Sequence, residues 1–212
     1  MLDHDGVVVD SLDVFSSSLI EACRQLGIGG VVAPADVVAL FEGNYYESFH
    51  AAGAGDAQIR EATRRTVGAL RNALPWLRPF PLMPEVLAEL AQARHVAIVT
   101  SNDGDLVKAF LRRHRIAGVA EVMGEAAGQS KTAKIEALMA RFPGQETYWF
   151  VGDTAGDMRE ARRAGATPLG VAWGWHEPEL LEAAGAERIA ASPADLLAIV
   201  APELSADFLG IG

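Results

Sequence analysis

The sequence predicts an α/β protein with a parallel sheet and an inserted all-helical domain. Short apolar runs rich in β-branched and aromatic residues end in small polar residues or glycine, as buried parallel strands do. Amphipathic helical patterns lie between these runs, and such alternation is typical of parallel sheets with helices on both faces. One long stretch near the start contains helical patterns in series and breaks the alternation.

Three runs are predicted to form strands of one sheet: HVAIVTSND (95–103), TYWFVGD (147–153) and PLGVAWG (168–174). Helical patterns separate them, with apolar residues at i, i+3 or i+4 spacing at Leu106, Val107, Phe110 and Leu111, and at Ile135, Leu138, Met139 and Phe142. The predicted core is therefore Rossmann-like, with three layers. Ligands of such sheets bind beyond the carboxyl ends of the strands.

Residues 13–78 are predicted to form the helical insert, so that residues 1–12 and 79–212 make up the core. Apolar faces at helical spacing occur at Leu19, Ala22, Cys23 and Leu26, at Val37, Val38 and Phe41, and at Ile59, Thr63, Thr66, Val67, Leu70 and Leu74. The segment PWLRPFPLMPEV (75–86), with four prolines, is interpreted as the linker that returns the chain to the core. The last twelve residues, APELSADFLGIG, show no clear period and predict no element.

The composition indicates which partners to expect. Half of the 212 residues are apolar, which suits one large domain or a domain with a small satellite. The formal net charge of −10 argues against nucleic acid as a partner, because such binding depends on Lys and Arg neutralising phosphates. No signal peptide or run of about 18 apolar residues is visible, so we expect no membrane partner and a cytoplasmic protein, monomer or homodimer. Cys23, the single cysteine, is expected to be a small buried hydrophobe.

If these strand assignments hold, polar residues from four places would meet at one edge of the predicted sheet. They are Asp3 and Asp5 near the start; Thr100, Ser101 and Asn102 after the first strand; Lys131 at a helix start; and Asp153 and Asp157 after the second strand. Taken singly, each has an ordinary structural explanation, such as a helix N-cap, a turn or a solvated charge. Their convergence at the ligand-binding edge favours an active site.

These residues occur in motifs that resemble the haloacid dehalogenase-like superfamily, in its order and over nearly the whole chain. The family's first motif, DxDGxxxDS, is matched by DHDGVVVDS (3–11), and its fourth, GDxxxD, by GDTAGD (152–157). A Thr or Ser that ends an apolar strand is matched by AIVTSN, and a lysine that opens a helix by SKTAKIEAL. The helical insert lies where the phosphoglycolate phosphatase-like branch carries a small helical cap.

The resemblance implies phosphoryl transfer through an aspartyl-phosphate. Asp3 would be the nucleophile, and water would later hydrolyse the intermediate. Because a carboxylate and a phosphate monoester repel each other, the site needs a hard cation with oxygen ligands, and Mg²⁺ fits best. The metal ligands that the resemblance implies are Asp3, the backbone carbonyl of Asp5, Asp153 and, directly or through water, Asp157.

The remaining motif residues would bind the transferring phosphoryl group. Thr100, with the backbone amides around Ser101 and Asn102, would hold the phosphoryl oxygens. Lys131 would offset the negative charge during transfer. Lys134 is the competing lysine, and Lys131 is preferred because it directly follows Ser130 at the expected helix start.

Asp5 discriminates between branches of the family. A second aspartate can protonate the leaving alkoxide and then deprotonate the attacking water. The resemblance implies that dehalogenases lack an acid at this position. The leading hypothesis is therefore a Mg²⁺-dependent phosphatase for a small phosphorylated metabolite, phosphoglycolate-like or a sugar phosphate.

Two alternatives stay open. A sugar phosphomutase of the β-phosphoglucomutase type shares all four motifs and differs in whether the aspartyl-phosphate meets water or a sugar hydroxyl. A catalytically weak protein would use the same pocket to sense phosphate or to contact a partner. Phosphonate hydrolysis is disfavoured, because the resemblance calls for a Schiff-base lysine in the cap and no lysine occurs between Asp13 and Pro79.

Several further residues near the predicted edge have open roles. In the stretch GNYYESFH (43–50), Tyr45, Tyr46, Glu47 and His50 could face the leaving group, although packing is favoured for the tyrosines. His4 is expected to be a partly buried structural residue, because strand alternation would turn it away from both aspartates. The candidates for a cap interface or a dimer surface, with core packing as the default, are Trp173, Trp175 and His176.

Only Met1 and Leu2 precede Asp3, although related proteins usually carry several apolar residues before this aspartate. A central strand of this length would bury little apolar surface. We expect either a natural start further upstream or a form less stable than one extended by about five apolar residues. Melting temperatures of the two forms test this, and no gain on extension would contradict it.

Overall fold

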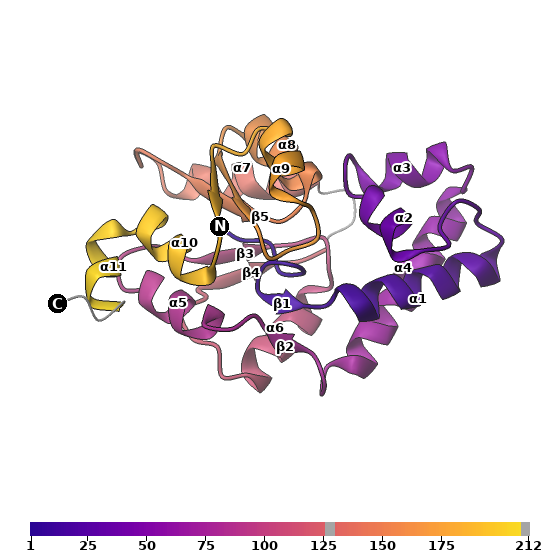
Figure 1. The fold of residues 1–212 in the computed structure, drawn as a ribbon, viewed down its shortest axis with the longest axis horizontal. Helices are drawn as coiled ribbons and strands as arrows, with labels where there is room; N and C mark the ends of the chain where they lie inside the picture. Colours follow the sequence, from indigo (N-terminus) through magenta and orange to yellow (C-terminus); the bar gives the residue numbers. More distant parts are fainter. Residues whose placement is uncertain (126–129, 209–212) are drawn as a thin grey trace.

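The computed structural model describes residues 1–125 and 130–208 and confirms the α/β class (Figure 1). Its parallel strands are β3 (Ala97–Val99), β4 (Glu121–Met123), β5 (Trp149–Gly152), β6 (Thr167–Val171) and β7 (Arg188–Ala190). β4 pairs with β3, while β5, β6 and β7 pair in that order. Leu2 forms parallel bridges to Ile98 of β3 and Val151 of β5, so the N-terminal residues join the two halves.

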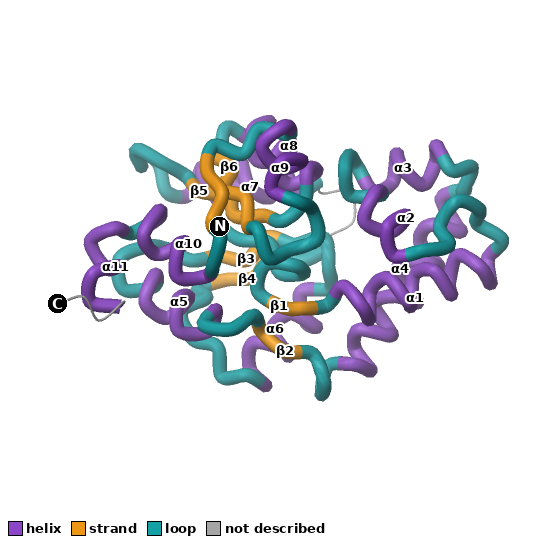
Figure 2. The backbone as a smooth tube through the Cα atoms, in the orientation of Figure 1, coloured by secondary structure: helices purple, strands orange, loops and turns teal. Residues whose placement is uncertain are grey.

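Helices cover both faces of this sheet because side chains alternate along its strands. Ile98 and Val151 pack into the main core cluster with residues of α5 (Met83–Leu90), α6 (Gly104–Arg113) and α10 (Pro193–Val200). Val99 and Phe150 pack on the opposite face against α7 (Lys131–Arg141) and α8 (Ala155–Ala164). Figure 2 shows the strands between these helices. α9 (Pro178–Ala183) and α11 (Pro202–Phe208) complete the fold.

All three predicted strands are present, each shorter than its apolar run. β4 and β7 were not predicted. Each has only three residues, one of them charged, so neither forms a continuous apolar run in the sequence. In the unassigned last twelve residues, α11 occupies 202–208, while Leu209 and Ile211 lie outside the described residues.

The chain from 12 to 73 forms four helices, α1 (Leu12–Leu26), α2 (Pro34–Ala39), α3 (Tyr45–Ala51) and α4 (Asp56–Ala73), here called the helical unit. They project to one side of the core (Figure 1). The unit has its own hydrophobic cluster, in which Leu19, Cys23 and Ile59 are fully buried. Leu70, near the end of α4, instead joins the main core cluster. The last part of α4 therefore anchors the unit to the core.

A short antiparallel ribbon lies where the chain enters and leaves the helical unit. β1 (Val9–Asp10) pairs with β2 (Arg78–Pro79). The interpretation of residues 75–86 as a linker was therefore incomplete, since this segment contains β2 and the start of α5. Proline is compatible with both places: Pro79 lies in a two-stranded ribbon, and Pro84 occupies the first turn of α5.

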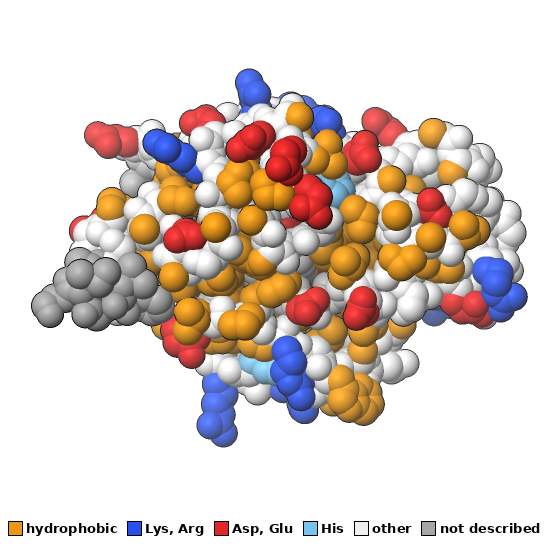
Figure 3. Space-filling model, viewed as in Figure 1, with side chains coloured by type: hydrophobic (Ala, Val, Ile, Leu, Met, Phe, Trp, Pro, Cys, Tyr) orange, Lys and Arg blue, Asp and Glu red, His pale blue; other side chains and the backbone are white. Residues whose placement is uncertain are grey.

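On the face drawn in Figure 3, acidic side chains lie over both the core and the helical unit, consistent with the net charge of −10. Within residues 1–125 and 130–208, no helix is both long enough and apolar enough to cross a membrane.

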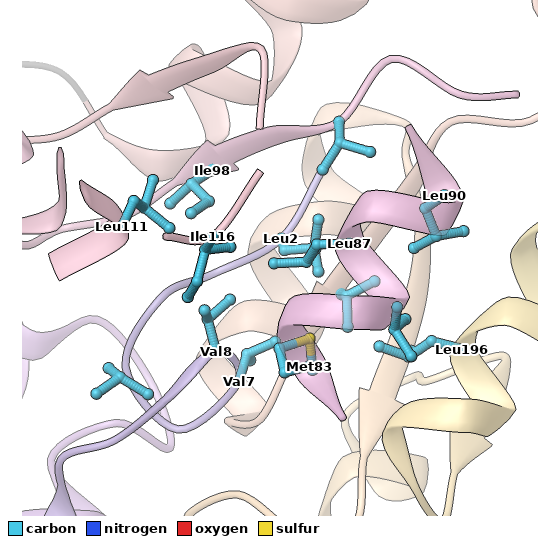
Figure 4. Packing of buried hydrophobic residues seen from close by; sticks show 14 of the residues in the cluster. Leu2, Val7, Val8, Met83, Leu87, Leu90, Ile98, Leu111, Ile116 and Leu196 are labelled. Carbon is cyan, nitrogen blue, oxygen red and sulfur yellow. The ribbon is translucent and has the colours of Figure 1, made fainter. Parts of the chain in front are cut away.

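The first motif is anchored in the main core cluster. Leu2, Val7 and Val8 are buried against Met83 and Leu87 of α5 (Figure 4). The segment that carries Asp3 and Asp5 is thus held by apolar residues on both sides, which fixes the two aspartates at the carboxyl edge of the sheet.

Candidate active site

The first motif forms a tight loop directly after its contact with the sheet. The amide of Asp3 donates to the carbonyl of Val151, and the carbonyl of His4 accepts from the amides of Val8 and Val9. Gly6 adopts a positive φ of 74°, and a Cβ built there would lie 1.9 Å from Oδ2 of Asp153. Glycine is therefore required at this position, both for the turn and for the close approach of the first and fourth motifs.

Three buried carboxylates gather at this edge. Ligand atoms of Asp3, Asp153 and Asp157 all lie within 4.8 Å of one another. Burial, followed by the negative charges of Asp157 and Asp3, raises the pKa of Asp153 well above its usual range. One oxygen of Asp153 accepts from the amide of Trp175 (2.9 Å), whereas Oδ1 is buried without a hydrogen-bond partner among the described residues. Such a cluster of oxygen donors suits a hard cation.

Asp157 is positioned by the start of α8. Its Oδ2 accepts from the amide (3.2 Å) and the hydroxyl (2.8 Å) of Thr154, and the Thr154 hydroxyl accepts from the Asp157 amide (3.2 Å). This reciprocal capping box fixes the carboxylate at the helix N-terminus. Thr154 is thus a genuine helix N-cap, one of the ordinary structural explanations that the sequence allowed. Asp157, its partner in the capping box, also belongs to the acidic cluster.

The structure places Lys131, and not Lys134, on the acidic cluster. Nζ of Lys131 lies 2.8 Å from Oδ2 of Asp3 and 2.5 Å from Oδ1 of Asp157. Burial opposes the charge of Lys131, but the carboxylates of Asp157 and Asp3 hold its pKa well above the usual range. Nζ of Lys134 instead donates to the backbone carbonyls of Thr100 and Gly124.

Asp5 lies outside the group formed by Asp3, Asp153 and Asp157, and its side chain accepts hydrogen bonds from two donors. The Ser11 hydroxyl donates to Oδ1 (2.7 Å), and Nδ2 of Asn102 donates to Oδ2 (2.8 Å). Burial would raise the pKa of Asp5, but polar contacts with His4, Asn102 and Ser11 bring it below its usual value. Sequence reasoning assigned Ser11 no role, although its place as the last residue of the first motif was a usable signal.

The expectation that His4 points away from both aspartates was wrong for Asp5. Nδ1 of His4 lies 3.5 Å from Oδ2 of Asp5, and the ring packs edge-on against Phe110. His4 is also fully buried, with 2% exposure. Strand alternation fails here because the regular pairing ends at Leu2 and the chain then turns through Gly6.

The loop after β3 supplies a second set of polar groups. The Thr100 hydroxyl accepts from the amide of Asn102 (3.1 Å), and Asp103 caps α6 by accepting from the amides of Asp105 and Leu106. The loop therefore leads directly into a helix N-terminus, a setting that favours bound anions.

One cavity of about 620 Å³ joins all these groups to the helical unit. It is lined by every residue predicted for the site: Asp3, Asp5, Thr100, Ser101, Asn102, Lys131, Asp153 and Asp157. From the helical unit, Phe15, Phe41, Tyr45 and Tyr46 line the same space. The cavity thus has a charged floor on the core and, on the helical unit, a wall that combines these aromatic rings with polar side chains such as Arg60 and Thr63.

The stretch GNYYESFH contributes less to the cavity than its polar content suggested. Tyr45 packs against Phe41 and Phe49, and its hydroxyl contacts Thr63. Tyr46 is 43% exposed. Neither Glu47 nor His50 lines the cavity, and His50 contacts Asp56 instead.

Trp175 and His176 join the core to the helical unit. The Trp175 ring contacts Phe15 and Phe41. Nδ1 of His176 accepts from the amide of Ala155 (2.9 Å), and Nε2 donates to the carbonyl of Val38 in α2 (3.1 Å). Trp173 packs in the core, where its indole donates to the carbonyl of Val7. Of the roles left open for these residues, an interface with the helical unit is confirmed for Trp175 and His176.

Comparison with known proteins agrees with the motif order. The family profile described as haloacid dehalogenase-like hydrolase matches residues 1–171, which is most of the chain. This chain is a haloacid dehalogenase-like hydrolase. The match spans all four motifs and the whole helical unit.

Similar proteins cover almost the full length of this hydrolase. A phosphoglycolate phosphatase from Synechococcus elongatus is 28% identical over 205 residues, covering 94% of this chain and 95% of the relative. A haloacid dehalogenase-like hydrolase from Streptococcus pneumoniae has a solved structure that matches with a TM-score of 0.75 at 24% identity, over 94% of this chain and 96% of that one. A hydrolase from Pseudomonas syringae matches with a TM-score of 0.75 at 21% identity, over 94% and 95%. The two structures support the fold alone.

Proposed function

We propose that this hydrolase is a phosphatase that acts on a small phosphorylated metabolite, either phosphoglycolate-like or a sugar phosphate. The observation that carries the proposal is the placement of Asp5, which lines the same cavity as Asp3 and is held by Ser11 and Asn102. An acid beside the nucleophile serves the departure of an alkoxide, whereas halide departure requires no proton. The relative from Synechococcus elongatus, named as a phosphoglycolate phosphatase, supports this class of substrate.

Asp3 is proposed as the nucleophile. Its carboxylate would attack phosphorus, forming an oxygen–phosphorus bond while the bond to the substrate oxygen breaks. Lys131, bonded to Asp3 and Asp157, would partly neutralise the negative charge that gathers around the phosphoryl group. The Thr100 hydroxyl and the amides of the loop that leads into α6 would hold the phosphoryl oxygens.

Asp5 is proposed as the acid and base. It would give a proton to the departing substrate oxygen and then take a proton from the water that hydrolyses the aspartyl-phosphate. Such a role requires a defined orientation of the carboxyl group. The hydrogen bonds from Ser11 and Asn102 supply one.

The acidic cluster is proposed to hold Mg²⁺. Its carboxylate ligands would be Asp3, Asp153 and Asp157, and the backbone carbonyl of Asp5 would complete the protein ligands. The unpartnered, buried Oδ1 of Asp153 and the raised pKa of this carboxyl group fit a cation at this place. When bound, Mg²⁺ would supply positive charge that allows the carboxylate and the phosphoryl group to approach each other.

The helical unit is proposed to act as a cap. The proposed cap domain keeps the bounds predicted from the sequence, residues 13–78, and so includes the few residues that follow α4. Its aromatic and polar side chains form one wall of the cavity. The Trp175 ring contacts the unit at Phe41, and His176 is hydrogen-bonded to it at Val38. A cap in this position would exclude water from the reacting groups and select the substrate.

A screen over small phosphoesters, with and without Mg²⁺, tests the proposed function. The expected result is Mg²⁺-dependent release of inorganic phosphate from at least one two- or three-carbon phosphate or sugar phosphate. A sugar phosphate that isomerises without net phosphate release would support a phosphomutase instead. No turnover of any compound, together with phosphate binding, would support the phosphate-sensing alternative.

A further inference from the structure

We propose that Lys134 is a positioning residue of the phosphoryl site: its ammonium group ties the loop after β3 to Gly124, directly after β4, and thereby sets the place of Thr100. The inference rests on the proposed function, since it assigns the Thr100 loop to the phosphoryl group. The chain has only three lysines, Lys108, Lys131 and Lys134, and two of them line the cavity. Lys131 bonds to the carboxylates of Asp3 and Asp157, so Lys134 is the lysine of the cavity to which the proposed reaction assigns no role.

Lys134 joins two loops that are far apart in sequence. Its Nζ donates to the carbonyl of Thr100 (2.5 Å), directly after β3, and to the carbonyl of Gly124 (3.1 Å), directly after β4. The side chain comes from the first turns of α7 and is 2% exposed. One buried ammonium therefore connects three elements at the floor of the cavity.

Gly124 packs so closely against the start of α6 that a side chain at this position would not fit. A Cβ built on Gly124 would lie 2.3 Å from the amide nitrogen of Gly104, the first residue of α6. The amide of Glu125 donates to the carbonyl of Asn102 (2.7 Å), and the amide of Thr100 donates to the carbonyl of Met123 (3.0 Å). The close packing of Gly124 on Gly104, the two backbone hydrogen bonds and the ammonium of Lys134 therefore hold the loop of residues 100–102 in place.

Burying the charged ammonium of Lys134 at this place is unfavourable in free energy. Burial, and then the nearby ammonium of Lys131, lowers the pKa of Lys134. An apolar side chain of similar length would avoid both effects if packing were the only requirement. Lys134 instead donates to two carbonyl acceptors and lines the cavity. These contacts indicate that its hydrogen bonds and its charge are needed to position the loop of residues 100–102.

The test compares Lys134→Met with Lys108→Met, which removes the exposed lysine that pairs with Asp105 on α6. Inorganic phosphate is the probe, and its binding is measured by the rise in melting temperature with phosphate concentration, which requires no turnover. We expect Lys134→Met to weaken phosphate binding and lower kcat/KM by about ten- to a hundredfold, the range for lost hydrogen bonds from a charged group. Lys108→Met should change either quantity by less than about twofold.

Two further measurements separate positioning from general loss of stability. Amide hydrogen exchange in residues 100–105 should accelerate in Lys134→Met, while exchange in β6 stays as in the wild type. In a double-mutant cycle, Thr100→Val and Lys134→Met should be less than additive in kcat/KM, because the lysine acts through the threonine loop. If the methionine variant does not fold, Lys134→Gln replaces it, since glutamine is too short to reach both carbonyls.

Unchanged phosphate binding in a folded Lys134 variant, or strictly additive effects with Thr100→Val, would overturn the inference. These outcomes are distinct from failure of the proposed function, which would show as a wild-type protein that hydrolyses no phosphoester. The phosphate-binding and exchange measurements remain decisive in that case, because neither depends on activity.

Discussion

The Asp3→Asn variant is expected to release phosphate at least about 10³-fold more slowly than the wild type, because an amide cannot act as the nucleophile. The fold should tolerate the change. Burial raises the pKa of Asp3; the ammonium of Lys131 opposes this shift, the negative charges of Asp157 and Asp5 add to it, and the net direction is upward. Removing one charge from the metal-free cluster should therefore leave the melting temperature unchanged or raise it.

Steady-state phosphate release and thermal unfolding of the same preparation check both parts. Asp13→Asn is a matched control, since it makes the same chemical change on an exposed aspartate at the start of α1. It should keep nearly full activity. Substantial turnover by Asp3→Asn would contradict the assignment of Asp3 as the nucleophile. A large fall in its melting temperature would contradict the expected tolerance of the fold, and the lost activity would then reflect unfolding.

The second large effect concerns Asp153 and Mg²⁺. At a concentration about 100 times its dissociation constant, Mg²⁺ should stabilise the wild type by about 2.7 kcal/mol, which corresponds to about 5–10 °C in melting temperature for a chain of this size. Asp153→Asn should lose most of this rise, because it removes a ligand whose Oδ1 has no partner among the described residues. An equal rise in wild type and variant would contradict the proposed metal site.

Without metal, the raised pKa of Asp153 makes stability depend on pH in a defined direction. The folded state holds the proton of this carboxyl group more tightly than the unfolded state, where the pKa is near 3.8. Its contribution is therefore fully present below that pH and is lost as the pH rises toward the folded-state pKa. Asp3 acts in the same direction.

Urea unfolding of the metal-free protein at a series of pH values above 3.8 checks this dependence. The free energy of unfolding of the wild type should fall with rising pH relative to that of Asp153→Asn, because the amide does not titrate. Saturating Mg²⁺ should remove the difference in slope, since a cation favours the ionised carboxylate. Parallel curves for the two metal-free proteins would contradict the buried acidic cluster as the cause.

The amino-acid order alone was sufficient for the fold class and for the eight predicted residues that the fold brings to one cavity. Apolar runs that end in polar residues predicted β3, β5 and β6, and the first and fourth motifs predicted that Asp3 and Asp153 would meet. These inferences succeeded because carboxyl ends of parallel strands share one edge, whatever the details of packing. The helical character of the insert was equally visible, since helical periodicity is local. The three predicted faces correspond to α1, α2 and α4, whereas α3 was not predicted.

Other features depended on how the elements pack. Lys131 and Lys134 lie one turn apart on α7, and either could have been the lysine of the site; the rotation of α7 against β3 directs the first to Asp3 and the second to Thr100. β4 and β7 are too short and too polar to be recognised, and their neighbours define them as strands. The contact of His4 with Asp5 and the hydrogen bond from His176 to Val38 likewise could not be predicted from any periodic pattern in the sequence. Local patterns specify which residues form each element, whereas contacts between elements depend on rotations and loop paths that only the packed core determines.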